Sequence, residues 1–171
     1  MRIINLIVVH CSATREDCTL SPEDLDRLHR RRGFNGTGYH YYIRKDGTVH
    51  LTRPIERIGA HAKGFNAHSI GICYEGGLDC RGRPADTRTP EQRAALRLLV
   101  HQLLEKFPDC RVCGHRDLSP DKNGNGEIEP EEWMKACPCF DAEEEFKELV
   151  AEGTVETQSK LNYLKNEKGG K

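Results

Sequence analysis

The sequence has no long hydrophobic run and no excess of either charge. No apolar stretch approaches the roughly 20 residues that a membrane-spanning helix needs, so we expect no membrane partner. Lys and Arg total 26 against 27 Asp and Glu, which gives a net charge of −1. Non-specific nucleic-acid binding depends on neutralising phosphates, so this balance argues against a nucleic-acid partner. Internal repeats and low-complexity segments are also absent, which favours one ordinary domain for 171 residues.

The start of the chain also lacks a recognisable secretion signal. Residues 1–10 are apolar but short, carry no small-residue cleavage site and end in a polar cluster. We therefore predict a buried strand there, in a chain that begins either in the cytoplasm or after removal of an unseen leader.

Cysteine and histidine are the residues present in unusual number, with eight of each. This abundance suggests a metal site. An even cysteine count permits several structural disulfides, but a domain of this size buries enough surface without them, so we expect free thiols and one or two metal ligands. Cys110 and Cys113 form a C-x-x-C pair and are the cysteines expected to oxidise most readily.

Hydrophobic periodicity and turn residues predict an α/β fold, a single domain with a mixed central β-sheet flanked by about three helices. Helices are predicted to begin after the capping residues Ser21, Thr89 and Asp141. Strands are predicted over residues 3–9, 39–44, 48–52, 69–74 and 111–114. We place the domain at residues 1–152 and a polar C-terminal tail at residues 153–171.

Three residues at the ends of predicted elements are candidate metal ligands. His10 ends the first strand, His115 directly follows the last strand, and Cys137 lies in a Lys-Ala-Cys-Pro segment. Two His and one Cys suit a catalytic zinc, which keeps a fourth position open for water. Their wide separation carries no spacing signature, so a structural histidine and inert thiols remain an alternative. A rival zinc knuckle would use Cys110, Cys113, Cys137 and Cys139, with an unusually short final spacing.

Six short motifs occur in order along the chain. They are Val8–Thr14, Gly38–His40, Gly59–Asn66, Ser69–Gly71, Gly114–His115 and Lys135–Asp141. Together they resemble the zinc-dependent N-acetylmuramoyl-L-alanine amidases related to phage amidase lysozymes and peptidoglycan recognition proteins, over roughly residues 3–150. The resemblance implies a mixed sheet flanked by helices, with a groove over the metal that accepts a peptidoglycan stem.

The resemblance also implies residue roles. His10, His115 and Cys137 match the zinc ligands, and Tyr39 and Lys135 match a catalytic tyrosine and lysine. The implied reaction is hydrolysis of the amide between N-acetylmuramate and L-alanine, with zinc-bound water as the nucleophile. Lys135 would stabilise the oxyanion, and Tyr39 would orient the water or bind the intermediate. Judged from the residues alone, Tyr39 would be an ordinary strand aromatic and Lys135 a solvated lysine.

Two further residues are candidate substrate contacts. His61 matches a recurring histidine on the active-site side, and Asn66 lies where a contact with the stem peptide is plausible. Ser12 and Thr14 follow the first candidate ligand and either line the pocket or make structural hydrogen bonds.

Residues 121–132 fit the pattern of a calcium-binding EF-hand loop, inserted between the second and third zinc ligands. The candidate ligands are Asp121, Asn123, Asn125, Glu127 through its backbone carbonyl, and Glu132. Residues 121–148 contain ten acids and three lysines, a net charge of −7. The upstream flank does not have the pattern of a helix, so a solvated turn is the alternative. We expect weak, structural calcium binding here.

Two other classes of function are compatible with the resemblance. A non-catalytic peptidoglycan-binding module is disfavoured because Tyr39, Lys135 and Cys137 are all present. A regulatory protein that binds an intracellular partner has no independent signal in the sequence. We therefore expect a monomeric zinc hydrolase, made without a visible signal peptide, that acts on cell-wall peptidoglycan after lysis or export, as a phage or prophage endolysin does.

Overall fold

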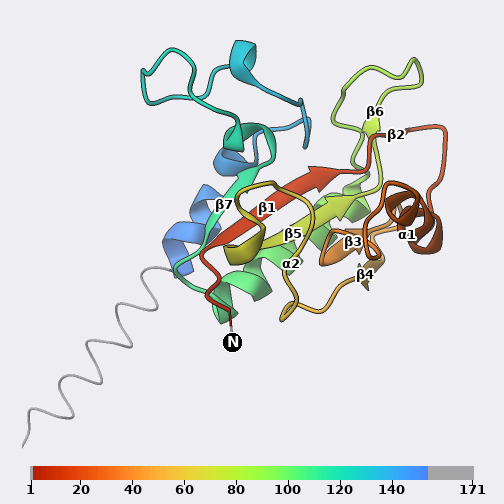
Figure 1. Ribbon diagram of the computed structural model, residues 1–171, viewed down its shortest axis with the longest axis horizontal. Helices are drawn as coiled ribbons and strands as arrows, with labels where there is room; N and C mark the ends of the chain where they lie inside the picture. Colours follow the sequence, from red (N-terminus) through yellow and green to blue (C-terminus); the bar gives the residue numbers. More distant parts are fainter. Residues whose placement is uncertain (1, 154–171) are drawn as a thin grey trace, which may run out of the picture.

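A five-stranded mixed β-sheet forms the centre of the computed structural model, which describes residues 2–153 (Figure 1). The strands are β1 (Leu6–Cys11), β3 (Tyr41–Ile43), β4 (Val49–Leu51), β5 (Ser69–Tyr74) and β7 (Arg111–Gly114), in the order β4-β3-β5-β1-β7. The helices are α1 (Pro22–Arg31), α2 (Pro90–Lys106) and a segment over residues 142–153. The predicted α/β class, with a mixed sheet and three helices, is confirmed.

Strand β1 runs parallel to both of its neighbours in the sheet. Its register pairs His10 with Cys73 of β5 and Val9 with Gly114 of β7. Only β4 is antiparallel, joined to β3 by a tight turn in which Gly47 has a φ of 82°. Because the carboxyl ends of parallel strands meet at one edge of a sheet, the residues that follow β1 and β7 are neighbours in space.

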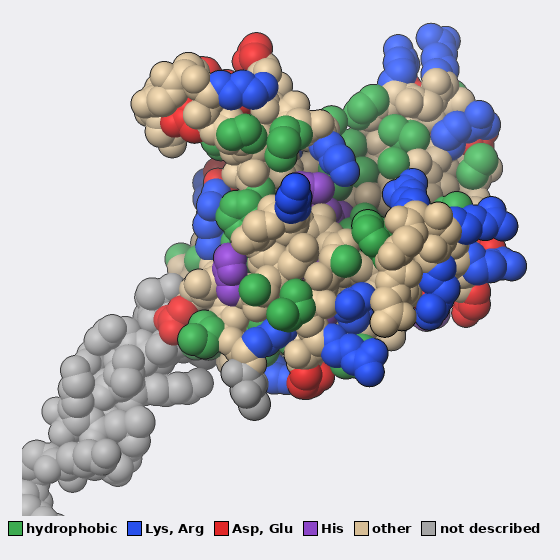
Figure 2. All heavy atoms as spheres, viewed as in Figure 1, with side chains coloured by type: hydrophobic (Ala, Val, Ile, Leu, Met, Phe, Trp, Pro, Cys, Tyr) green, Lys and Arg blue, Asp and Glu red, His purple; other side chains and the backbone are tan. Residues whose placement is uncertain are grey.

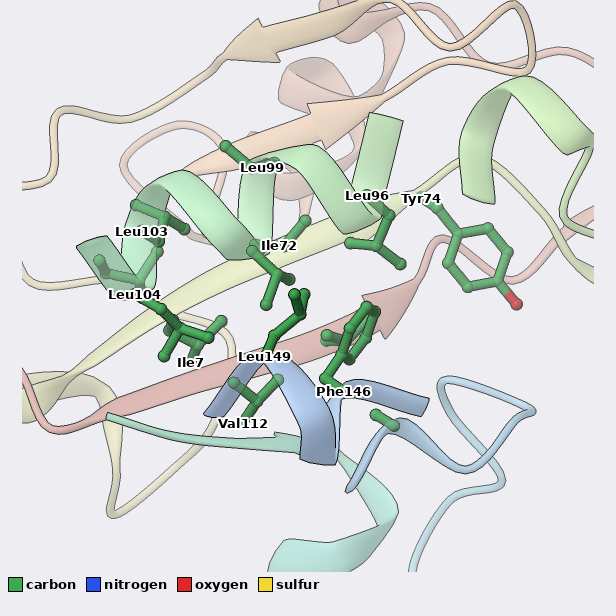
Figure 3. Close-up of a cluster of buried hydrophobic side chains, with 14 of the residues drawn as sticks. Ile7, Ile72, Tyr74, Leu96, Leu99, Leu103, Leu104, Val112, Phe146 and Leu149 are labelled. Atoms are coloured by element: carbon green, nitrogen blue, oxygen red, sulfur yellow. The ribbon is translucent and has the colours of Figure 1, made fainter. Parts of the chain in front are cut away.

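Side chains of β1 alternate between the two faces of the sheet. Ile7 and Val9 enter the main core, whereas Val8 packs in a separate cluster on the other face, to which His10 also points by the same alternation. Helix α2 covers the core face together with the helical segment 142–153 (Figure 3). The residues contributed by the two helices include Leu96, Leu99, Leu103, Leu104, Phe146 and Leu149.

Helix α1 covers part of the opposite face. Its Leu25 packs against Tyr42 and Cys73, which alternate away from the main core. As predicted, Ser21 caps the helix, accepting a 3.1 Å hydrogen bond from the backbone N–H of Asp24. The face opposite α2 is therefore only partly covered, which leaves room for a polar site.

A second, two-stranded sheet was not anticipated from the sequence. It pairs β2 (Thr14–Arg15) with β6 (Gly77–Leu78), in segments for which no strand was predicted. Strands of two residues are too short for an alternation signal. Three short 3-10 helices complete the described chain, at Asn66–His68 (η1), Arg116–Leu118 (η2) and Pro130–Glu132 (η3).

The polar tail predicted over residues 153–171 lies outside the described residues, except for Gly153, which is helical. Across residues 2–153, no helix combines the length and the apolar character needed to cross a membrane.

Candidate metal centre

Two histidines meet at the carboxyl ends of β1 and β7. His10 is the penultimate residue of β1, and His115 directly follows β7. The backbone N–H of His115 donates a 3.1 Å hydrogen bond to the carbonyl of Val9, so the pairing of the strands continues up to the second histidine. The two imidazole centroids lie 4.7 Å apart.

Cys137 reaches the same point from a segment distant in sequence. Its carbonyl accepts a 2.8 Å hydrogen bond from the N–H of Arg116, and its Sγ accepts one of 3.2 Å from the N–H of Cys11. The candidate ligand atoms of His10, His115 and Cys137 all lie within 4.8 Å of one another. Over residues 2–153, no other group of three or more His, Cys, Asp or Glu is arranged in this way.

This donor set fits a zinc ion with an open coordination position. Burial is the main cause that lowers the pKa of His10 well below its ordinary value, and nearby histidines and Lys135 add to the effect. Burial, followed by the Lys135 ammonium, lowers the pKa of His115 to about 4. Both imidazoles are therefore neutral at neutral pH, and a neutral imidazole offers the lone pair that a metal requires.

A cavity of about 370 Å³ opens over the three candidate ligands. In the space-filling view, histidine side chains are visible at the bottom of a hollow in this face (Figure 2). The cavity is also lined by Tyr39, Lys135, His61 and Ser12. The structure thus brings the predicted ligands and the predicted catalytic residues around one space.

Tyr39 lies beside the first histidine, with its ring centroid 5.1 Å from that of His10. Burial raises the pKa of the Tyr39 phenol well above its ordinary value. The hydroxyl therefore keeps its proton at neutral pH and is suited to donate a hydrogen bond rather than to act as a base. Gly38 allows the close approach of this segment, because a Cβ there would overlap the carbonyl oxygen of Ala60.

Lys135 is exposed and lines the cavity two residues before Cys137. After burial, the nearby Lys135 ammonium adds to the lowering of the pKa of both His10 and His115. A cation at this place can stabilise an oxyanion that develops above the ligands.

His61 lines the cavity and also contacts one candidate ligand, His10. Its Nδ1 lies 3.0 Å from Nε2 of His10. The side-chain oxygen of Asn66 accepts hydrogen bonds from the backbone N–H groups of His61 and Ala62, both at 2.9 Å. Asn66 thus shapes its own loop, and this geometry gives no support to the substrate contact predicted for it.

Other cavity residues were not identified from the sequence. His29, Arg32 and Phe34 lie on the cavity wall, at or just after the end of α1. Arg32 follows two further arginines, and nothing in the sequence distinguishes it from them. Thr14 is not on the wall; its Oγ1 lies 2.7 Å from the hydroxyl of Ser12.

The eight cysteines are free thiols in this structure. Cys110 packs in the main core and Cys113 in the cluster on the other face, so the pair expected to oxidise most readily does not meet. The prediction failed because the two side chains point to opposite faces of the sheet. The rival four-cysteine knuckle is not formed for the same reason.

The structure gives no support to the calcium prediction. Residues 121–127 are exposed, and the side chains of Asp121 and Glu132 accept hydrogen bonds from backbone N–H groups within the loop. Neither carboxylate belongs to a group of converging ligands among the described residues. Calcium binding by this loop, which would also involve Asn123, Asn125 and Glu127, stays a prediction.

Known proteins share both the sequence and the fold. A family model described as N-acetylmuramoyl-L-alanine amidase matches residues 1–139. The endolysin of Enterobacteria phage K11 is 36% identical over 144 residues, which cover 83% of this chain and 86% of that protein. The endolysin of Escherichia phage T7 is 36% identical over 146 residues, which cover 84% and 87% of the two chains.

Solved structures agree with these relatives. The N-acetylmuramoyl-L-alanine amidase LysC from Clostridium intestinale URNW superposes with a TM-score of 0.63 at 30% identity, over 87% of this chain and 84% of that chain. Bumblebee PGRP-SA superposes with a TM-score of 0.63 at 23% identity, over 86% and 81% of the two chains, and shares the fold. The resemblance inferred from the motifs is confirmed.

Proposed function

Since this chain belongs to the N-acetylmuramoyl-L-alanine amidase family, we propose that it hydrolyses the amide between N-acetylmuramate and L-alanine of peptidoglycan at a zinc centre. The observation that carries the proposal is the convergence of His10, His115 and Cys137 within 4.8 Å, beneath a cavity that also contains Tyr39 and Lys135.

The proposed ligands are His10, His115 and Cys137. A zinc ion held by these residues would supply an acidified water as nucleophile and a Lewis acid for the amide carbonyl. The Cys137 sulfur accepts a hydrogen bond from the N–H of Cys11, which holds it beside the two histidines. The protein would hold the metal from one side through these three donors, and the side that faces the cavity would stay free for substrate.

Two side chains of the chain act on the reacting amide in this proposal. Lys135 places a positive charge next to the oxyanion that forms when the carbonyl carbon becomes tetrahedral. Tyr39 keeps its proton, because burial raises its pKa, and donates a hydrogen bond to the attacking water or to the intermediate. The phenol is not required to ionise in this scheme.

The substrate is a peptidoglycan stem, and the setting is the cell wall. The endolysin relatives support action on the wall after lysis or export. We expect the protein to act as a monomer, without nucleic acid or membrane as a partner.

The test is to incubate the purified protein with muropeptides and to identify the products by mass spectrometry. We expect free stem peptide, lost on zinc chelation and recovered when zinc is returned. Absence of stem-peptide release from the zinc-loaded protein would defeat the proposal. Muropeptide binding without release would instead support a non-catalytic peptidoglycan-binding module.

A further inference from the structure

The imidazole of His61 packs against two glycines, Gly59 and Gly71, that have no side chain to obstruct it. A Cβ at Gly71 of β5 would lie 2.6 Å from the His61 ring, and a Cβ at Gly59 would lie 2.5 Å from it. These separations are far below van der Waals contact, so side chains at either position would displace the ring. The loop that carries His61 is fixed in turn by the Asn66 side chain, through two 2.9 Å hydrogen bonds.

The two ring nitrogens of His61 each meet a partner. Nδ1 lies 3.0 Å from Nε2 of His10, and Nε2 lies 3.3 Å from the hydroxyl of Ser69. Ser69 is fully buried, on the same face of the sheet as Gly71. The three side chains therefore form a chain of contacts that runs from the candidate metal centre into the protein interior.

His61 contacts His10 from outside the ligand group. It is not among the residues whose ligand atoms lie mutually within 4.8 Å, although it touches one of them. Nε2 of His10 is engaged by His61, so Nδ1 of His10 is the nitrogen left for a metal.

On the basis of the proposed zinc site, we propose that His61 is a positioning residue. It fixes the tautomer and orientation of His10, so that His10 offers Nδ1 to the metal. A neutral imidazole carries one proton, so a His10 that uses Nδ1 as ligand carries its proton on Nε2. That N–H then donates to Nδ1 of His61, and the Nε2–H of His61 donates to the oxygen of Ser69. Such outer partners set the orientation and the basicity of metal-bound histidines.

The test measures zinc affinity rather than catalysis. Metal-free full-length protein is titrated with zinc in competition with a chromophoric chelator. Loss of an outer-shell partner typically weakens metal binding by about 10- to 100-fold, which is the expected effect of His61→Leu. His61→Asn keeps an oxygen acceptor near the place of Nδ1 and should recover most of the affinity. The matched control is His68→Leu, the same change on the same loop, in a residue that packs against Phe65 and should leave zinc affinity unchanged.

The outcomes separate this inference from the proposed function. Wild-type protein that binds no zinc would defeat the zinc site itself. Wild-type protein that binds zinc with the same affinity as folded His61→Leu would overturn the positioning role. If His61→Leu does not fold, nitrogen-15 spectra of histidine-labelled, zinc-loaded wild-type protein decide the matter. A protonated Nε2 and a metal-bound Nδ1 on His10 support the inference, and a metal-bound Nε2 overturns it.

Discussion

The backbone N–H of Cys11 points at the sulfur of Cys137, at 3.2 Å, although the two residues are 126 positions apart in the chain. Strand β1 therefore contributes twice to the candidate centre, through the side chain of His10 and through the backbone of the residue that follows it. A hydrogen bond from a backbone amide orients the sulfur without adding a second titratable group.

Replacing Lys135 with alanine should lower kcat by about 100-fold, because it removes one source of oxyanion stabilisation. We expect KM to change little and zinc affinity not to fall, since Lys135 is exposed, is not a candidate ligand and carries a charge that repels a cation. Steady-state kinetics with a muropeptide substrate test this. The control is Lys122→Ala, because Lys122 is an exposed lysine in the loop of residues 121–132. A raised KM with kcat intact would instead assign Lys135 to substrate binding.

Replacing Tyr39 with phenylalanine should lower kcat by roughly 10- to 100-fold through loss of a hydrogen-bond donor. Because burial raises the pKa of this phenol, its ionisation should not shape the rate profile at neutral pH. The variant should therefore keep the pH dependence of the wild type at a lower rate. Tyr41→Phe, on the adjacent strand, controls for loss of a tyrosine hydroxyl. If the wild-type rate rises or falls with pH and that change is absent from Tyr39→Phe, the result would contradict this role.

Replacing Gly114 with alanine should weaken zinc binding while leaving most of the fold intact. A Cβ at this position would overlap the ring of Pro138, which directly follows the third candidate ligand. Chelator competition measures the affinity, and circular dichroism checks the fold. Gly82→Ala is the control: Gly82 has a φ of 79°, but a Cβ there would meet no other side chain of the described residues within 4 Å. Equal zinc affinity in both variants would show that residues 137–139 shift to accommodate the Cβ without weakening metal binding.

Replacing Arg88 with methionine should destabilise the domain by about 3 kcal/mol. Arg88 is only 6% exposed; its guanidinium donates to Asp86 and Glu145 at 2.8 Å and lies over the ring of Phe140. It thereby ties the last helix to the loop before α2. Arg93→Met, which breaks a more exposed pair with the same Asp86, should cost less than about 1 kcal/mol. Urea unfolding of both variants tests the prediction, and equal losses would contradict it.

Acid should destabilise the metal-free domain partly through His40. Burial lowers the pKa of His40 from 6.5 to about 4. Its Nδ1 accepts a 3.0 Å hydrogen bond from the N–H of Gly71, and protonation would remove that acceptor. The unfolded chain thus binds the proton more readily than the folded one, so stability is lost as pH falls from about 6.5 towards about 4.

The measurement is the free energy of unfolding at pH 7 and pH 4 in chelator, for wild type and His40→Asn. The comparison cancels the contribution of the other histidines. We expect the variant to lose less stability between the two pH values, by up to about 3 kcal/mol. An equal loss in both proteins would mean that His40 does not titrate in this range.

Much of the fold was predictable because its signals are local. The capping residues Ser21 and Thr89 fix where α1 and α2 begin, and a β-branched run marks β1. The pairing of β2 with β6 had no such signal, because two residues show no periodicity. The face of the sheet on which a side chain lies was harder to predict than the helices and strands themselves. Cys110 and Cys113 are close in sequence but lie on opposite sides of the sheet.

The candidate centre could be predicted only through the resemblance, because its ligands lie far apart in the chain. Spacing alone left His10, His115 and Cys137 as one option among several. The contact between His61 and His10 depends on Gly59 and Gly71, which leave space for the His61 ring. A sequence motif does not indicate that two distant glycines flank the same side chain. Arg32 on the cavity wall is likewise set by where α1 ends.

The segment that carries the loop of residues 121–132 is closed at its base by two hydrogen bonds, from Arg116 N–H to the Cys137 carbonyl and from Met134 N–H to the Ser119 hydroxyl. The second and third candidate ligands are thus held together independently of the chain that runs between them. This makes the tip of the loop, around residues 123–126, a place where the protein can accept a reporter peptide or a binding tag. We expect a longer chain there to change the span of the loop and to leave the atoms that would hold the metal in place.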